Sequence, residues 1–275
     1  MVDEKLQKII AHLGLASRRE AERWIADGRV SVNGSIAELG DRANEKDKIR
    51  IDGKLIQVTA KSDFQRQMLA YHKPEGEICS RKDPEGRPSV FDTLPTIRNG
   101  RWLNVGRLDI NTSGLLFFTN DGELANRLMH PSHQVLRKYA ARVRGEVTEA
   151  ILRQLTQGVE LEDGPAHFES IEDAGGEGSN HWYNVTLREG KNREVRRLWE
   201  AFDIQVSRLH RIQYGPFLLP RTLRKGRWQA LPPEELKLFE DLVGLKPTVQ
   251  PKKPIVTNRK KLKNKVLKAR KIHKK

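Results

Sequence analysis

The stretch GRLDINTSGLLFFTNDGELANRLMHP, residues 106–131, joins a polar loop, an apolar run and an amphipathic segment. Residues 113–119 show no alternation of apolar and polar side chains, which indicates a strand covered on both faces. A turn then leads into a short predicted helix that ends at Met129. Asp109 stands just before the strand, two residues after Arg107. A carboxylate and a guanidinium at the mouth of a buried strand form either a loop ion pair or part of a reactive site.

The segments around this stretch mix strands with helices. Alternating or apolar runs predict strands at residues 69–71, 139–143 and 182–187, and apolar spacing predicts a helix over 195–202. This helix places Arg193, Arg196 and Arg197 off its apolar stripe. The order has no regular β-α-β repeat, so the sequence predicts an α+β domain.

The first 60 residues form a separate pattern of two short helices and small strands. Apolar residues spaced as on one helical face begin at Leu6, and Ser17 with Glu20 makes a capping box for a second helix. Asn33-Gly34 is a strong signal for a hairpin turn. Exposed cations on these helices are free to meet phosphates, although arginines on a helix surface are usually only solvated.

Bulk composition indicates a soluble chain with room for a sizeable core. The chain has 275 residues, of which 37% are hydrophobic and 32% charged. It contains no apolar run of membrane-spanning length, begins with polar residues, and has a single cysteine, Cys79. We therefore expect a cytoplasmic protein without a membrane partner.

The net charge of +15 is concentrated at the C-terminus. Residues 246–275 contain 11 lysines, 2 arginines and no acidic residue, whereas the rest of the chain is nearly balanced. Such a block predicts a disordered basic tail that interacts with a polyanion, and RNA is the abundant polyanion of the cytoplasm. A solvated terminus without a partner is the alternative.

Motifs for cofactors and metals are missing from the sequence. Neither a Walker-type nor a dinucleotide-binding glycine loop occurs, and the 8 histidines are scattered. Cys79 has no base within its motif. We therefore expect no cofactor and no metal, which leaves Asp109 with its arginine neighbours. Arginines in a basic groove would pair with this carboxylate and keep its pKa low, so it would be ionised and ready to act as nucleophile or base.

The chain resembles the ribosomal pseudouridine synthases in several stretches that occur in the same order: LAYHKPEGEICSRKDPEGRPSVFDTLP, VGRLDINTSGLLFFTNDGELANRLMHP, KYAARVRGEV and WYNVTLREGKNREVRRLWEAFDIQVSRL. EKLQKIIAHLGLASRREAERWIADGRVSVNG resembles the S-four-type RNA-binding domain. The similarity extends over residues 4–240. It implies a pseudouridine-synthase fold with a mixed, largely antiparallel central sheet. The expected limits are 1–60 for the RNA-binding domain, 61–67 for a linker, 68–245 for the catalytic domain and 246–275 for the tail.

The resemblance also implies roles for individual residues. Asp109 matches the essential carboxylate, and Arg107 matches the arginine that fills the space left by a flipped base. Tyr139 matches the tyrosine that stacks on the flipped uracil, although an aromatic on a strand is often a core residue. Arg196 matches the arginine that pairs with the aspartate, although its place on the helix also suits a surface residue.

The implied substrate is a structured stem-loop of 23S rRNA, with the target uridine near the peptidyl-transferase region and the enzyme acting as a monomer. A different rRNA uridine and a non-catalytic assembly factor are alternatives. A glycosidase would need a second carboxylate as general acid. The expected RNA contacts are the cations Lys5, Lys8, Arg18, Arg19, Arg23, Lys191, Arg193 and Arg197.

Overall fold

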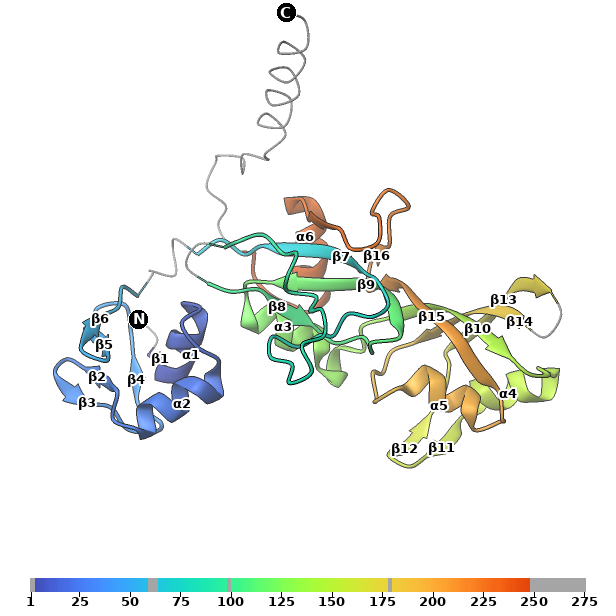
Figure 1. Ribbon diagram of the computed structural model, residues 1–275, viewed down its shortest axis with the longest axis horizontal. Helices are drawn as coiled ribbons and strands as arrows, with labels where there is room; N and C mark the ends of the chain where they lie inside the picture. The colour runs from blue at the N-terminus through green and yellow to red at the C-terminus, as the bar shows by residue number, and fades with distance from the viewer. Residues whose placement is uncertain (1–2, 59–63, 98–99, 178–179, 248–275) are drawn as a thin grey trace, which may run out of the picture.

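The computed structural model describes residues 3–58, 64–97, 100–177 and 180–247 (Figure 1). Within these ranges a small N-terminal domain precedes a larger domain built on one sheet. No helix in this part of the chain combines the length and apolar character that crossing a membrane requires. Residues 61–63 of the predicted linker and 248–275 of the predicted tail lie outside the described residues.

The N-terminal domain contains both predicted helices and the predicted hairpin. Ser17 caps the second helix, because its side chain accepts a hydrogen bond of 3.1 Å from the backbone N–H of Glu20. Asn33 has a φ of +54°, a conformation that suits a tight hairpin turn. Both helices pack their apolar faces into one small core. The elements are β1 (Glu4–Lys5), α1 (Leu6–His12), α2 (Arg18–Ala26), β2 (Val30–Val32), β3 (Ser35–Ile36), β4 (Arg42–Ala43), β5 (Ile49–Ile51) and β6 (Lys54–Leu55).

The larger domain is built on a sheet of nine strands. The main path runs β13-β14-β10-β15-β9-β7-β17, with β16 paired to β15 and β8 paired to β9. Every pairing is antiparallel except that of β15 with β9, so the sheet is mixed and largely antiparallel, as predicted. The strands are β7 (Met68–Lys73), β8 (Leu103–Val105), β9 (Thr112–Thr119), β10 (Arg137–Arg144), β13 (Ser170–Glu177), β14 (Asn180–Leu187), β15 (Gln205–Tyr214), β16 (Phe217–Leu218) and β17 (Trp228–Ala230).

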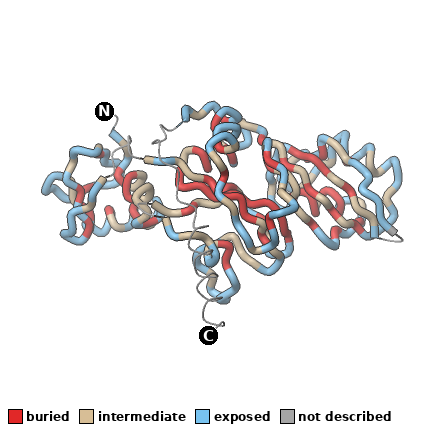
Figure 2. The backbone as a smooth tube through the Cα atoms, turned by 90° about the horizontal axis from the view of Figure 1, so that it is seen from above, coloured by how far each residue is buried: buried red, intermediate tan, exposed pale blue. Residues whose placement is uncertain are grey.

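Helices cover both faces of this sheet. Strand β9 is buried at all eight positions, which confirms the strand predicted from its unbroken apolar run. Leu116 belongs to the core cluster that contains Trp199, whereas Phe117 belongs to the cluster that contains Phe239. Figure 2 shows buried residues through the interior of the larger domain and a smaller group of them in the N-terminal domain. The first cluster is covered by α4 (Glu149–Gln157) and α5 (Glu194–Glu200), and the second by α3 (Gly122–Met129) and α6 (Pro233–Leu242).

The parallel junction between β9 and β15 brings two backbones very close together. Gly114 has a φ of +109°, and a Cβ atom there would lie 2.3 Å from the backbone oxygen of Arg211. Only glycine fits both the backbone conformation and the available space. This contact joins the two halves of the sheet, with β10, β14 and β13 on one side and β7 and β17 on the other.

Strand β15 was not among the sequence predictions. Its sequence, QVSRLHRIQY, breaks the expected alternation with several polar and charged residues. Arg211 nevertheless is only 2% exposed, and its guanidinium contacts the backbone oxygen of Leu115 and the ring of Tyr214. The short hairpin of β11 (Val159–Leu161) and β12 (Gly164–Ala166) was also not predicted.

Candidate active site

Asp109 lies in an open cavity of about 1210 Å³ on the larger domain. The walls come from the loops around residues 78–87 and 104–112, from the segment 187–195, and from strands β10 and β15. Arg107, Tyr139, Lys191 and Arg193 also line this cavity, so the fold brings together five of the predicted site residues. Arg196 and Arg197 are not on its lining.

The carboxylate of Asp109 has no hydrogen bond or ion pair to any residue that the structure describes. The residue is half-buried, and its backbone oxygen accepts a hydrogen bond of 3.0 Å from the N–H of Thr112. Arg107 is exposed to the cavity. The ion pair expected for Asp109 is therefore not formed with a described residue. Its carboxylate is open to whatever enters the cavity.

Lys73 holds the backbone of the Asp109 loop through hydrogen bonds from its buried ammonium group. This lysine is completely buried at the end of β7. Its Nζ donates hydrogen bonds to the backbone oxygens of Asp109 at 3.0 Å, Thr112 at 2.9 Å and Pro74 at 3.0 Å. Burial is the main cause that lowers the pKa of Lys73. Several carbonyl acceptors around one ammonium hold the loop while leaving the Asp109 side chain free.

Two further side chains hold the same loop. The thiol of Cys79 lies 3.3 Å from the backbone oxygen of Leu108, and burial raises its pKa. Arg196 is only 5% exposed, so its predicted place off the apolar stripe does not bring it to the surface. Its guanidinium donates to the backbone oxygens of Asn111 at 3.1 Å and Val206 at 2.7 Å.

Arg196 thus links helix α5 and strand β15 to the Asp109 loop. Burial lowers the pKa of Arg196, and the negative charge of Asp109 is among the influences that raise it. No ion pair between these two side chains occurs among the described residues. Their direct pairing stays a prediction, whereas the backbone contact to Asn111 is observed.

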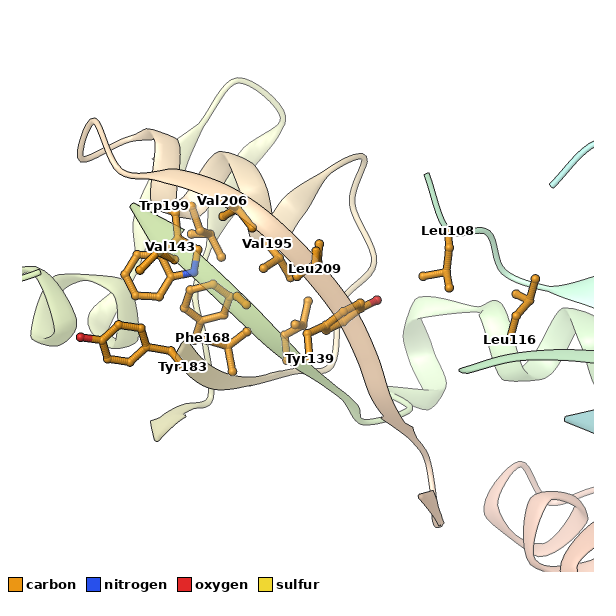
Figure 3. Close-up of a cluster of buried hydrophobic side chains, with 14 of the residues drawn as sticks. Leu108, Leu116, Tyr139, Val143, Phe168, Tyr183, Val195, Trp199, Val206 and Leu209 are labelled. Carbon is orange, nitrogen blue, oxygen red and sulfur yellow. The ribbon is translucent and has the colours of Figure 1, made fainter. Parts of the chain in front are cut away.

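Tyr139 occupies the end of the first core cluster that faces the cavity. It is 9% exposed, and it is both a member of that cluster and part of the cavity wall. Figure 3 shows its ring extending from β10 toward the side where Leu108 lies, away from Trp199. Tyr139 is therefore a core residue that also lines the cavity, and its stacking on a flipped uracil stays a prediction.

A pair of buried arginines forms the wall beside Tyr139. Arg137 donates to the backbone oxygens of Val135 and Glu189, and Arg211 donates from Nε to the oxygen of Leu115 at 2.7 Å. Both guanidinium groups lie about 5 Å from the ring centroid of Tyr214, at 5.3 and 5.0 Å. The Nη2 atom of Arg211 is buried without a hydrogen-bond partner among the described residues. This wall keeps the cavity positively charged close to Asp109.

Comparison with known proteins agrees with this geometry. A family model described as "RNA pseudouridylate synthase" matches residues 67–201, and one described as "S4 domain" matches residues 4–49. Ribosomal large subunit pseudouridine synthase B of Escherichia coli K12 is 55% identical over 99% of this chain and 94% of its own length. The synthase B of Pseudomonas aeruginosa is 57% identical over 91% of this chain, and the match spans 65% of that relative's length.

The chain belongs to the RNA pseudouridylate synthase family. Among solved structures, one described as a crystal structure of pseudouridylate synthase aligns with a TM-score of 0.60. It is 26% identical, and the alignment covers 86% of this chain and 99% of that one. The S4 match at residues 4–49 precedes the synthase match at residues 67–201, which is the order of the two predicted domains.

Several cations that were predicted as RNA contacts of this pseudouridylate synthase already have acidic partners. Lys8 pairs with Glu4 and Arg23 pairs with Glu20. In the larger domain Arg193 pairs with Glu200 at 3.3 Å, Arg197 with Asp163 at 2.8 Å and Lys191 with Glu189 at 3.4 Å. Lys5, Arg18 and Arg19 are exposed and have no ion pair among the described residues. All eight remain predictions, and the last three are the most available to a phosphate.

Sequence reasoning missed Lys73, Arg137 and Arg211 as parts of this pseudouridylate synthase site. The only signal for Lys73 was its position after a predicted strand and before Pro74. Nothing in the local sequence separates these residues from surface cations, because their burial depends on strands distant in the chain. Among the described residues no group of three or more His, Cys, Asp and Glu side chains could hold a metal ion.

Proposed function

We propose that this chain converts a uridine of 23S rRNA, near the peptidyl-transferase region, into pseudouridine. The observation that carries the proposal is the Asp109 carboxylate, which has no protein partner among the described residues and opens into a basic cavity. The high identity to proteins named ribosomal large subunit pseudouridine synthase B supports the choice of RNA. We further propose that the enzyme works in the cytoplasm as a monomer, with domain limits at 1–60, 61–67, 68–245 and 246–275.

The reaction breaks the bond between ring nitrogen one of uracil and the ribose, and forms a bond from ring carbon five to the same ribose carbon. Carbon five loses a proton and nitrogen one gains a proton, so the product is an isomer of the substrate. The base must first leave its stack, because the glycosidic bond is otherwise inaccessible. Asp109 acts on this nucleotide as a carboxylate, either by attack or by removal of a proton.

Tyr139 and Arg107 receive complementary roles in this proposal. Tyr139 lies between the core and the cavity, so its ring can stack on a flipped uracil without moving. Arg107 is exposed at the cavity two residues before Asp109, and its planar guanidinium suits the gap that the flipped base leaves. Tyr139→Phe should keep RNA affinity and lose rate, whereas Tyr139→Ala should lose both.

The buried cations of the site would have two roles: they would hold the Asp109 loop in place and attract the negatively charged RNA. Lys73 and Arg196 hold the backbone that carries Asp109. Arg211 and Arg137 supply positive potential to the cavity wall, which favours an RNA phosphate in the cavity that also contains Asp109. The basic tail would add attraction that depends on salt concentration.

Mapping of pseudouridine tests the proposal directly. Purified chain is incubated with separate transcripts of 23S and 16S rRNA, and pseudouridines are located by a chemical method that stops reverse transcription. One new pseudouridine in 23S rRNA is expected, at the position that stays unmodified in cells without this gene. Modification of 16S rRNA alone would overturn the choice of RNA. Binding without any modification would favour an assembly factor.

A further inference from the structure

A second hollow of about 730 Å³ lies where the N-terminal domain meets the larger domain. Its walls come from helices α1 and α2, from the segment 101–104 and from the start of α3. The two domains are in close contact beside it, because a Cβ atom added to Gly14 would lie 2.4 Å from the backbone oxygen of Gly100. The ring of Phe64 lies 4.5 Å from that of His12, which adds an aromatic contact between α1 and the chain that follows the first domain.

Three arginines on the lining of this hollow have no acidic partner among the described residues. They are Arg18 and Arg19 on α2 and Arg101 just before β8. Three carboxylates on the same lining have basic partners: Glu4 pairs with Lys8, Asp121 with Arg66 and Glu123 with Arg127. Glu45 is exposed and has no ion pair among the described residues, so it offsets one of the three arginine charges. The hollow therefore presents unneutralised positive charge.

Two of these arginines, Arg18 and Arg101, repel each other. Arg101 is half-buried, and its Nε atom is buried without a hydrogen-bond partner among the residues that the structure describes. Burial and the charge of Arg18 lower the pKa of Arg101, and burial and the charge of Arg101 lower the pKa of Arg81 behind it. The guanidinium of Arg81 donates to the backbone oxygen of Trp102, which keeps this third positive charge close. Like charges held together in this way favour a polyanion that would relieve the repulsion.

The hollow adjoins the active-site cavity. Asn104 and Met129 belong to the lining of both. From Arg101 the chain passes through β8 and Asn104 to Arg107 and the Asp109 loop. One surface thus connects helix α2 of the N-terminal domain to the catalytic aspartate.

We propose that this hollow is a second RNA-backbone site, in which Arg18, Arg19 and Arg101 contact consecutive phosphates of the strand that continues past Asn104 to the active site. The inference rests on the proposed function, because it assigns the path of the same RNA. It gives Arg101, a residue of the larger domain, a role in RNA binding together with the N-terminal domain. RNA bound there bridges the two domains and fixes their orientation.

The test measures RNA affinity over a salt series for full-length variants, with a labelled 23S rRNA stem-loop that carries the mapped uridine. Each lost phosphate contact should flatten the slope of log affinity against log salt by roughly 0.7–0.9. The double variant Arg18→Gln/Arg101→Gln should therefore lose about 1.4–1.8 from the slope, and Arg101→Lys should retain the slope of the parent. Arg153→Gln is the matched control, because Arg153 is an exposed arginine on α4 outside both linings.

A second RNA, trimmed to the loop and a few base pairs, separates this site from the active site. Affinity for the trimmed RNA should be equal in the parent and in the double variant, because it does not reach the hollow. The melting temperature of the free double variant at low salt should equal or exceed that of the parent, because a repulsion has been removed.

The proposal is overturned if Arg101→Gln has the same slope as Arg153→Gln, or if only Arg18→Gln changes it. It is equally overturned if the loss is the same for the trimmed RNA, or if Arg101→Lys behaves as Arg101→Gln does. Binding is measured without turnover, so a protein that binds with these slopes and makes no pseudouridine would fail the proposed function alone.

Discussion

Asp109 and Asp121 stand at the two ends of strand β9, and the fold treats their carboxylates in opposite ways. Asp121 is buried, accepts hydrogen bonds from the backbone N–H groups of Glu123 and Leu124 as the N-cap of α3, and pairs with Arg66 at 2.6 Å. Asp109 is half-buried, and its carboxylate forms no hydrogen bond or ion pair with a described residue. At Asp109 the protein instead holds the backbone, through Lys73 and Arg196. The oxygens of Asp121 are occupied and stabilise the fold, whereas those of Asp109 are free for the substrate contact that we propose.

The largest expected effect comes from replacing Asp109, the carboxylate without a described partner. Asp109→Asn should lower the single-turnover rate by ~10³-fold or more, because the amide cannot act as nucleophile or base. The melting temperature should stay within about 2 °C of the parent, since no described residue loses a contact. Rate and thermal midpoint are measured on the same preparation. A mutant with a tenth of the parent rate would contradict the assignment.

Removal of the ammonium beneath the loop should have the next largest effect. Lys73→Met keeps an unbranched side chain but leaves the backbone oxygens of Asp109, Thr112 and Pro74 without their donor. We expect a loss of ~2–4 kcal/mol in the free energy of unfolding, together with a reduced rate because the loop is no longer fixed. Urea unfolding and single-turnover kinetics measure the two effects. A mutant with unchanged rate would show that the loop does not depend on Lys73.

Asp121→Asn is the matched control at the structural end of the strand. Asparagine still caps a helix, but the ion pair with Arg66 is lost, and Arg66 keeps Glu240 as its partner. The expected loss is about 1–2 kcal/mol in the free energy of unfolding, with the single-turnover rate at saturating RNA nearly unchanged. If this substitution reduced the rate as strongly as Asp109→Asn, the distinction between the two carboxylates would not hold.

The smallest expected effect is a change in how stability depends on pH, and it involves His210, which contacts Ser113 near the start of β9. Ser113 Oγ lies 3.0 Å from Nδ1 of His210, and burial, followed by the charges of His72 and Lys225, lowers the pKa of His210 to about 4. The folded pKa is below the unfolded value of about 6.5, so the unfolded chain binds more protons between these values. Stability is therefore present above pH ~6.5 and decreases as the pH falls toward 4.

His210→Asn should remove part of this decrease. After allowance for the partial exposure of the ring, about 1 kcal/mol is expected, or roughly 2–4 °C in the difference between melting temperatures at pH 7 and pH 4.5. Thermal melts at the two pH values measure this difference. Equal differences in parent and mutant would remove His210 from the acid response.

The sequence was sufficient for features that depend on local patterns. The helices and the hairpin of the N-terminal domain follow from capping and turn residues, and the burial of β9 follows from its unbroken apolar run. The position of Asp109 before that strand was equally clear. These features depend on neighbours close in the chain.

Features that depend on distant strands were not predicted. Arg196 was expected off the core, yet it is buried because α5 packs on β15 and brings its guanidinium to the oxygen of Val206. Arg211 lies in a segment with many polar and charged residues, so its sequence context is that of a surface residue. It is buried only once β15 pairs with β9 and β10. These cations contact the Asp109 loop and the cavity wall only through residues that are distant in the sequence, so no single segment predicts their roles.

The parallel junction of β9 and β15 also has a consequence for a chain that is still being synthesised. Arg211 contacts the backbone of Leu115 across 96 residues of sequence. At about 5–20 residues per second, a ribosome needs roughly 5–20 s to make that interval. During this time the nascent chain already carries Asp109 but has no finished cavity around it. A growing chain therefore cannot complete this cavity before strand β15 has been made.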